Sequence, residues 1–193
     1  MPSVEKFKES LADLRVEEAI TAEINAGTDF LSSRSPKKAK AAYFQHAIEV
    51  MDRTLSPERV QEILEWNACC KGGARLKASK AFARANAGLS LVEKLQKITE
   101  VPNMGTPVLN ADGTITVHAV SYSDGEKFLC ACPNFNGVKR ESPVSRNYCF
   151  CCAGHFKFHY EILLGVTLQT VEISSSPLDT SGKEPSVLRF AIV

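Results

Sequence analysis

The chain lacks the segments that would direct it to a membrane or hold it there. No apolar run approaches the roughly 20 residues that a helix needs to span a bilayer. The first ten residues, MPSVEKFKES, are charged from the start and contain no apolar signal-peptide core. Seven cysteines, an odd number, in a chain with no export signal favour a reducing compartment. These absences predict a cytoplasmic protein with no membrane partner.

A strong excess of one charge is also missing. Lys and Arg number 23 and Asp and Glu 22, which leaves a formal net charge of +1. The overall charge therefore favours neither a nucleic-acid nor a membrane partner. A hydrophobic content of 44% is ordinary for a globular protein, and 193 residues suit one large domain or two small ones.

Common catalytic motifs are missing as well. His155 and His159 have the spacing of a zincin helix, but Phe156 stands where that motif has its glutamate base. No Ser-His-Asp order is legible, and no pair of carboxylates stands in a motif. The sequence therefore points to a kind of site without naming a reaction.

The first 100 residues carry repeated helix-start signals. Ser3 can cap a first helix, Ser56 followed by Pro57 is typical of another start, and Ser90 with Glu93 forms a capping-box pattern. Beyond Pro107 the pattern changes to strands. There we expect strands 114–120 and 127–131 paired as a hairpin, a helix over 154–164 ended by Gly165, and strands 168–174 and 187–193. The predicted fold is α+β: a helical domain over 1–100, then a cysteine-rich domain over 101–193 with a ββαββ antiparallel sheet.

Five of the seven cysteines are concentrated in 23 residues of the second half. They fall as C-x-C and C-x-C-C, and they are Cys130, Cys132, Cys149, Cys151 and Cys152. Thiolates at this density are typical of metal or redox sites. The last three are expected just before a helix, where free N–H groups and the helix dipole would lower a thiol pKa. His155 is a candidate neutral donor, while His159 is expected to be structural.

Alternatives to a zinc site stay open at this point. The spacings match neither zinc ribbons nor the common ferredoxin runs. Buried cysteines also act as small apolar side chains, and we favour that interpretation for the isolated pair Cys69 and Cys70. A less favoured candidate cofactor is an iron–sulfur cluster.

A basic segment provides a third, weaker candidate. From residue 67 to residue 92 there is no acid, and Gly72-Gly73 can expose N–H groups to an anion. Nucleic-acid binding is unlikely here, because no aromatic residues interleave with the charges. The candidate anion-binding residues are Lys71, Arg75, Lys77, Lys80 and Arg84.

Several longer stretches resemble a known family. They are YCFCCAGHFKFHYEILLG (148–165), VEISSSPL (171–178) and LRFAI (188–192). Their order resembles the C-terminal half of the 4-vinyl-reductase-like domains, which are predicted small-molecule binders. With ACCKGG (68–73) and SKAFA (79–83), the whole chain resembles an uncharacterised family of cysteine-rich bacterial proteins that share that tail.

The resemblance implies an α+β domain with a pocket between helix and sheet, and cysteines near its mouth able to hold zinc. One departure matters: those domains commonly have a cysteine just before the Arg-Phe of the last strand, where this chain has Ser186-Val187-Leu188. The leading hypothesis is a zinc-binding protein acting as a ligand-binding or accessory module, with a small molecule as its ligand. The alternatives are a thiol-redox or iron–sulfur electron-transfer protein, and an interaction protein that uses the basic segment 71–84.

Overall fold

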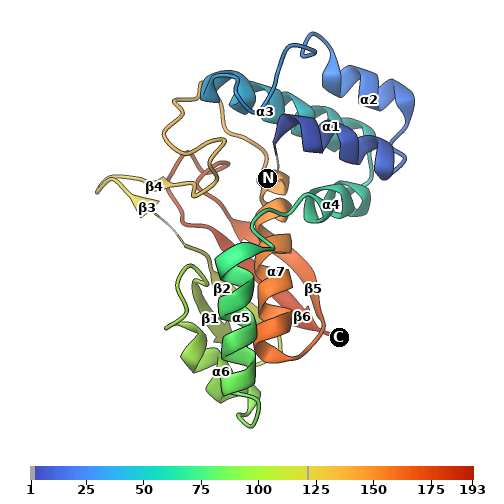
Figure 1. Cartoon of the computed structure of the whole chain (residues 1–193). Coiled ribbons are helices and arrows are strands. Elements are labelled where there is room, and N and C mark those ends of the chain that lie inside the picture. The colour runs from blue at the N-terminus through green and yellow to red at the C-terminus, as the bar shows by residue number, and fades with distance from the viewer. Residues whose placement is uncertain (1–2, 121) are drawn as a thin grey trace.

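The structure, a computed structural model, describes residues 3–120 and 122–193. Six helices precede the first strand in this part of the chain (Figure 1). They are α1 (Val4–Asp13), α2 (Glu18–Asn25), α3 (Lys37–Thr54), α4 (Pro57–Trp66), α5 (Gly73–Ala85) and α6 (Leu91–Ile98). Among the described residues, no helix is both long and apolar enough to cross a bilayer.

The predicted helix starts are confirmed by their caps. Ser3 accepts a hydrogen bond from the N–H of Lys6, and Ser56 caps α4 with Pro57 in its first turn. Ser90 and Glu93 form both hydrogen bonds of a capping box at the start of α6. Each cap satisfies N–H groups that have no partner inside the helix, so these short sequence signals fix where a helix begins.

The main sheet is antiparallel, with strand order β1-β2-β6-β5. Its strands are β1 (Thr106–Leu109), β2 (Ile115–His118), β5 (Leu168–Ser175) and β6 (Val187–Ile192), so the chain order around the long helix is ββαββ as predicted. The expected pairing of 114–120 with 127–131 is wrong. β2 pairs instead with β1 and β6, and a separate two-stranded ribbon joins β3 (Tyr122–Ser123) to β4 (Phe128–Leu129).

The physical reason lies in the edge strand that sequence reasoning missed. β1 contains Pro107, which cannot donate to a sheet ladder and so demotes a segment in any strand prediction. At an edge this is tolerated, and Pro107 lies opposite Val117 on β2. The turn at Asp112 and Gly113 joins the two strands, with the Asp112 carboxylate accepting from the N–H of Thr114.

α7 (Phe150–Leu164) is the helix around which the other elements pack. It contacts α4, α5, α6 and β5, and Figure 1 shows it beside α5 in front of the sheet. It ends at Gly165, which adopts the left-handed conformation with φ 74°, as predicted. It begins four residues earlier than the predicted helix, directly after the 3₁₀ helix η1 (Arg146–Cys149).

Gly154 allows α4 and α7 to cross closely. A Cβ at this position would lie 2.9 Å from both the Cα and the carbonyl oxygen of Glu65, closer than such atoms approach. The chain leaves α4 at Trp66, only a few residues before Cys69. The close crossing therefore brings the segment with Cys69 and Cys70 against the first turns of α7.

The apolar core runs without interruption through both halves of the described chain. Phe7, Tyr43 and Phe44 make edge-on ring contacts among α1 and α3, and Phe44 contacts the ring of Tyr148 in η1. The α+β class is confirmed, with helices in the first half and the antiparallel sheet in the second. The predicted domain boundary near residue 100 stays a prediction.

Candidate thiol-lined site

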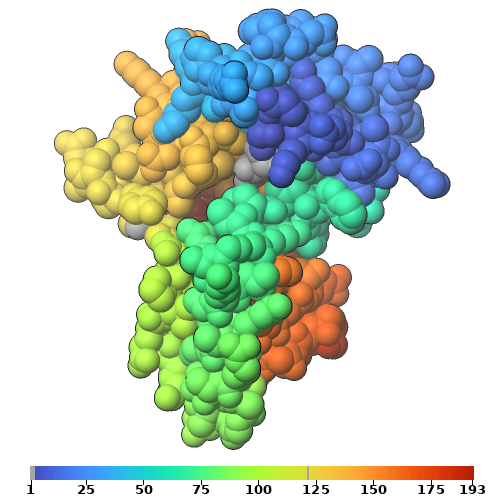
Figure 2. Space-filling model, viewed as in Figure 1, coloured from blue at the N-terminus to red at the C-terminus, as the bar shows by residue number. Residues whose placement is uncertain are grey.

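All seven cysteines line a single cavity of about 160 Å³. They come from three segments that are far apart in the sequence: Cys69 and Cys70, then Cys130 and Cys132, then Cys149, Cys151 and Cys152. Figure 2 shows the surface hollowed between the green start of α5 and the yellow-orange segment that carries β3, β4 and the loop after them. The fold therefore assembles one thiol-rich site, including the pair that the sequence interpretation had assigned to packing.

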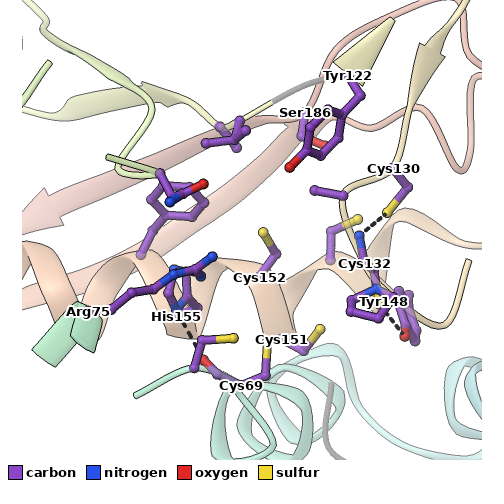
Figure 3. A pocket seen from close by; sticks show the side chains of 18 residues that line it. Cys69, Arg75, Tyr122, Cys130, Cys132, Tyr148, Cys151, Cys152, His155 and Ser186 are labelled. Atoms are coloured by element: carbon purple, nitrogen blue, oxygen red, sulfur yellow. Dashed lines mark hydrogen bonds between the residues drawn. The ribbon is translucent and has the colours of Figure 1, made fainter. Parts of the chain in front are cut away.

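The first turn of α7 supplies the centre of this site. Cys151 and Cys152 lie in that turn, with Cys149 just before it. Cys149 and Cys151 are buried, whereas Cys152 is partly exposed and projects into the middle of the cavity (Figure 3). The Cys149 thiol donates to the Ser176 hydroxyl at 3.1 Å, which fixes its direction.

The loop with Cys130 and Cys132 forms a second wall. The N–H of Cys132 donates to the Cys130 sulfur at 3.4 Å, so the two side chains share a tight turn. The Asn136 amide donates to the Cys130 carbonyl at 3.1 Å, and the Tyr148 hydroxyl lies 3.2 Å from the Cys132 sulfur. Tyr148 is fully buried and thus ties this loop to the aromatic core.

The turn with Cys69 and Cys70 forms the third wall, and two histidines one helical turn apart on α7 hold it in place. The Nδ1 of His155 donates to the Cys69 carbonyl at 3.0 Å, and the Nε2 of His159 donates to the Cys70 carbonyl at 2.9 Å. Cys70 has φ 61°, which is uncommon for a residue with a side chain. The histidines therefore hold a strained turn in place, which agrees with the structural role predicted for His159.

These contacts also define the histidine tautomers. Arg75 can only donate, so the Nε2 of His155 accepts from its Nη1 at 3.4 Å. The Nδ1 of neutral His159 accepts from the Ser79 hydroxyl at 2.8 Å. Burial, assisted by the charges of His159 and Arg75, lowers the pKa of His155 to about 4 and keeps it neutral at pH 7. Its role as a metal donor stays a prediction, and it would require the lone pair that now faces Arg75.

The expectation of low thiol pKa values at the start of α7 is wrong. Burial raises the pKa of Cys151 to about 12, with the neighbouring Cys132 and Cys69 adding to the effect. Burial likewise raises the pKa values of Cys149 and Cys152 well above the usual range and that of Cys130 to about 12. The helix start also has fewer free donors than predicted, because the Phe150 N–H donates to the Asn147 carbonyl of η1. These four thiols are therefore neutral unless a cation joins them, whereas the pKa of Cys69 is lowered even though burial acts to raise it.

The positive charges are divided between two sides of the site. Arg140 is half-buried and interacts electrostatically with Cys130 and Cys149. Arg75 lies on the wall with His155 (Figure 3). The other candidate anion-binding residues do not line the cavity: Lys77, Lys80 and Arg84 are exposed on α5, and Lys71 donates to the Glu65 carbonyl at 3.4 Å.

Several lining residues were not among the predicted site residues. Cys69, Cys70, Asn103, Tyr122 and Ser186 all line the cavity. For Cys69 and Cys70 the sequence did contain a signal, because two adjacent cysteines just after a helix could have been added to the candidate site. The other three lie in turns and strand ends with no recognisable spacing. Across residues 3–120 and 122–193, no three His, Cys, Asp or Glu side chains are grouped closely enough to act as ligands of one metal ion.

Comparison with known proteins adds no relative to this picture. No protein-family model, no curated protein and no solved structure matches the chain. The resemblance to the 4-vinyl-reductase-like domains therefore stays an expectation, and function must be argued from the cavity itself.

Proposed function

We propose that the protein binds zinc through the thiolates of its cysteine-lined cavity and serves as a ligand-binding or accessory module. The observation that supports this most strongly is the convergence of all seven cysteines on one cavity from three distant segments. Cysteines that served only as small apolar side chains would have no reason to gather around one open space, because protein cores leave few voids larger than a water molecule.

The raised thiol pKa values define what metal uptake at this site would require. Burial disfavours thiolates as long as the cavity holds no compensating charge. A divalent ion supplies that charge, displaces the protons and is bound by the resulting thiolates. The protein would therefore release protons when it takes up metal.

The candidate ligands are the five C-terminal cysteines, with His155 as a neutral donor. Cys69 joins them, because it lines the same cavity and is close enough to interact electrostatically with Cys151 and Cys152. Binding would require the thiols to change rotamer, which for cysteine is a rotation about one bond. Four thiolates would close a tetrahedral zinc site, whereas three would leave one position for water or a small molecule.

We also propose that the protein works in a reducing compartment, the cytoplasm. All seven cysteines are free thiols, several of them close enough to interact electrostatically. Oxidising conditions would convert neighbouring thiols to disulfides, which would remove them as ligands.

A second candidate function is thiol-redox chemistry, or electron transfer through an iron–sulfur cluster. The cavity has enough thiols for either, because Cys151 and Cys152 are vicinal and a cluster requires four of the seven cysteines. The cluster predicts iron and visible absorption, whereas the zinc proposal predicts a colourless protein.

The deciding experiment is elemental analysis of anaerobically purified protein, with its visible spectrum. We expect about one zinc per chain and a lower melting temperature after removal of the metal by a chelator. Cys151→Ser should reduce the zinc content, whereas Ala78→Ser places the same hydroxyl on an exposed position of α5, outside the cavity, and should leave it unchanged. Iron with colour would favour the cluster, and absence of any metal would overturn both the zinc site and the cluster and leave thiol-redox chemistry as the remaining candidate.

A further inference from the structure

The cavity has two chemically different sides. Thiols from α7 and from the loop with Cys130 form one side. The other side carries the guanidinium of Arg75, the amide of Asn103 and the hydroxyls of Tyr122 and Ser186. In Figure 3 the Arg75 guanidinium and the Tyr122 hydroxyl both point into the space beside Cys152. A metal held by thiolates would use the first side and leave the second without a function.

Arg75 is available for a ligand. It is half-buried, and within the described chain no carboxylate lies within ion-pair distance of it. Of its five N–H groups, one donates to a described residue, at the long distance of 3.4 Å to His155. A guanidinium with two parallel N–H groups free is suited to bind a carboxylate or phosphate through both.

The surroundings also favour an anion. Among the described residues that line the cavity there is no Asp or Glu that would repel one. Arg140, next to Cys130 and Cys149, already provides a positive charge near the thiols. Arg75 lies on the other side, where its charge acts on Cys70 and on the two histidines. The two arginines therefore have separate positions: Arg140 lies by Cys130 and Cys149, whereas Arg75 lies by Cys70 and the histidines and points into the open space.

The size of the cavity limits the ligand. Its volume of about 160 Å³ is close to that of an engineered cavity of roughly 150 Å³ that accepts benzene. It would take a metal ion and a molecule of only a few heavy atoms. A nucleotide or a peptide would extend well beyond such a space.

We infer that the cavity binds a small carboxylate, held by Arg75 through two hydrogen bonds and oriented by Tyr122 and Ser186, beside the metal. This inference rests on the proposed function, because the carboxylate would share the cavity with the zinc ion. It deepens that proposal by assigning the class of ligand: a carboxylic acid of up to about six heavy atoms.

The test is calorimetric titration of the zinc-loaded protein with acetate, pyruvate, citrate and inorganic phosphate. We expect acetate and pyruvate to bind, and citrate, the larger acid, to bind more weakly than either. R75Q should weaken acetate binding about tenfold or more, the value expected for loss of a charged two-point contact. K80Q removes an exposed charge from the same helix and should change nothing. Absence of acetate and pyruvate binding, or tighter binding of phosphate than of either, would overturn the inference.

The zinc content of each variant separates this inference from the proposed function. Normal zinc without carboxylate binding would overturn the inference and leave the metal site standing. If no variant holds zinc, the same titration of metal-free protein decides: Arg75-dependent acetate binding supports the subsite, and its absence removes it. R75K covers the case in which R75Q does not fold. It keeps the charge but lacks the two-pronged donor, so wild-type acetate affinity in R75K would overturn the proposed role of Arg75.

Discussion

The region between α1 and α3 and the region around the start of α7 are packed in opposite ways. The first region is filled by the large rings of Phe7, Tyr43 and Phe44, which are in edge-on contact. Phe7 and Phe44 are almost completely buried. The second region surrounds an open cavity with the small side chains of seven cysteines. A core built for stability alone is filled, so the difference makes the cavity the candidate functional part of the molecule.

Tyr148 links the two regions. Its ring contacts Phe44 on one side and Phe135 on the other, and its hydroxyl lies 3.2 Å from the Cys132 sulfur. The filled core thus supports one wall of the cavity. Damage to the core should therefore affect stability first, whereas damage to the cavity should affect metal binding first.

The largest effect is expected in the filled region. Phe44→Ala removes a buried ring and should lower the free energy of unfolding by about 3 to 5 kcal/mol, because the cavity it leaves cannot close. Urea denaturation measures this loss. Phe30→Ala is the matched control: Phe30 is 77% exposed, so its truncation should change stability by less than about 0.5 kcal/mol. Equal losses for both variants would contradict the assignment of the aromatic core.

An intermediate effect is expected where the two regions meet. Gly154→Ala places a methyl group 2.9 Å from the Glu65 backbone, so α4 and α7 must separate. We expect a loss of about 1 to 3 kcal/mol, the usual cost of overpacking. Zinc content should fall as well, because Cys69 moves away from α7.

Gly88→Ala provides the control for that variant. Its added methyl group meets no atom within 4 Å, and it should leave both the stability and the zinc content unchanged. A Gly154→Ala variant that keeps full zinc content would show that the close helix crossing does not position the thiols.

The smallest loss of stability is expected from a change at one wall of the cavity, the turn with Cys69 and Cys70. The other walls should stay in place. His159→Ala removes the donor to the Cys70 carbonyl and should cost about 1 to 2 kcal/mol. Thiol alkylation of the metal-free protein, followed residue by residue by mass spectrometry, should become faster at Cys69 and Cys70 while Cys149 stays protected. His118→Gln, on an exposed β2 side chain, should alter no rate. Uniform acceleration at all thiols would instead indicate a general loss of folding.

Much of the fold follows from local sequence signals. Ser3, Ser56 and Ser90 each mark a helix start because capping depends on residues within one turn. The alternation over Thr114–Val120 locates β2, but not its partners, because pairing depends on residues far away in the chain. Pro107 concealed the edge strand β1 for the same reason: a proline is acceptable in a strand only at an edge, and the edge is defined by the assembled sheet.

The site was predictable in kind but not in extent. Sequence density alone marked the five C-terminal cysteines as one cluster. It gave no reason to add Cys69 and Cys70, which reach the cavity because Gly154 lets α4 pack against α7 and two histidines hold the following turn. Local reasoning also predicted low thiol pKa values from the helix start, whereas burial, a tertiary property, raises them.

The sequence by itself determined the helix starts capped by Ser3, Ser56 and Ser90, the α+β class and the chemistry available to the site, since these depend on residue type and short-range spacing. Tertiary structure decided which thiols share a cavity, that burial raises the pKa values of most of them, and that Arg75 alone of the five candidate basic residues lines it. The physical reason is distance: capping and turn formation act over a few residues, whereas burial and charge act between groups that only the folded chain brings together.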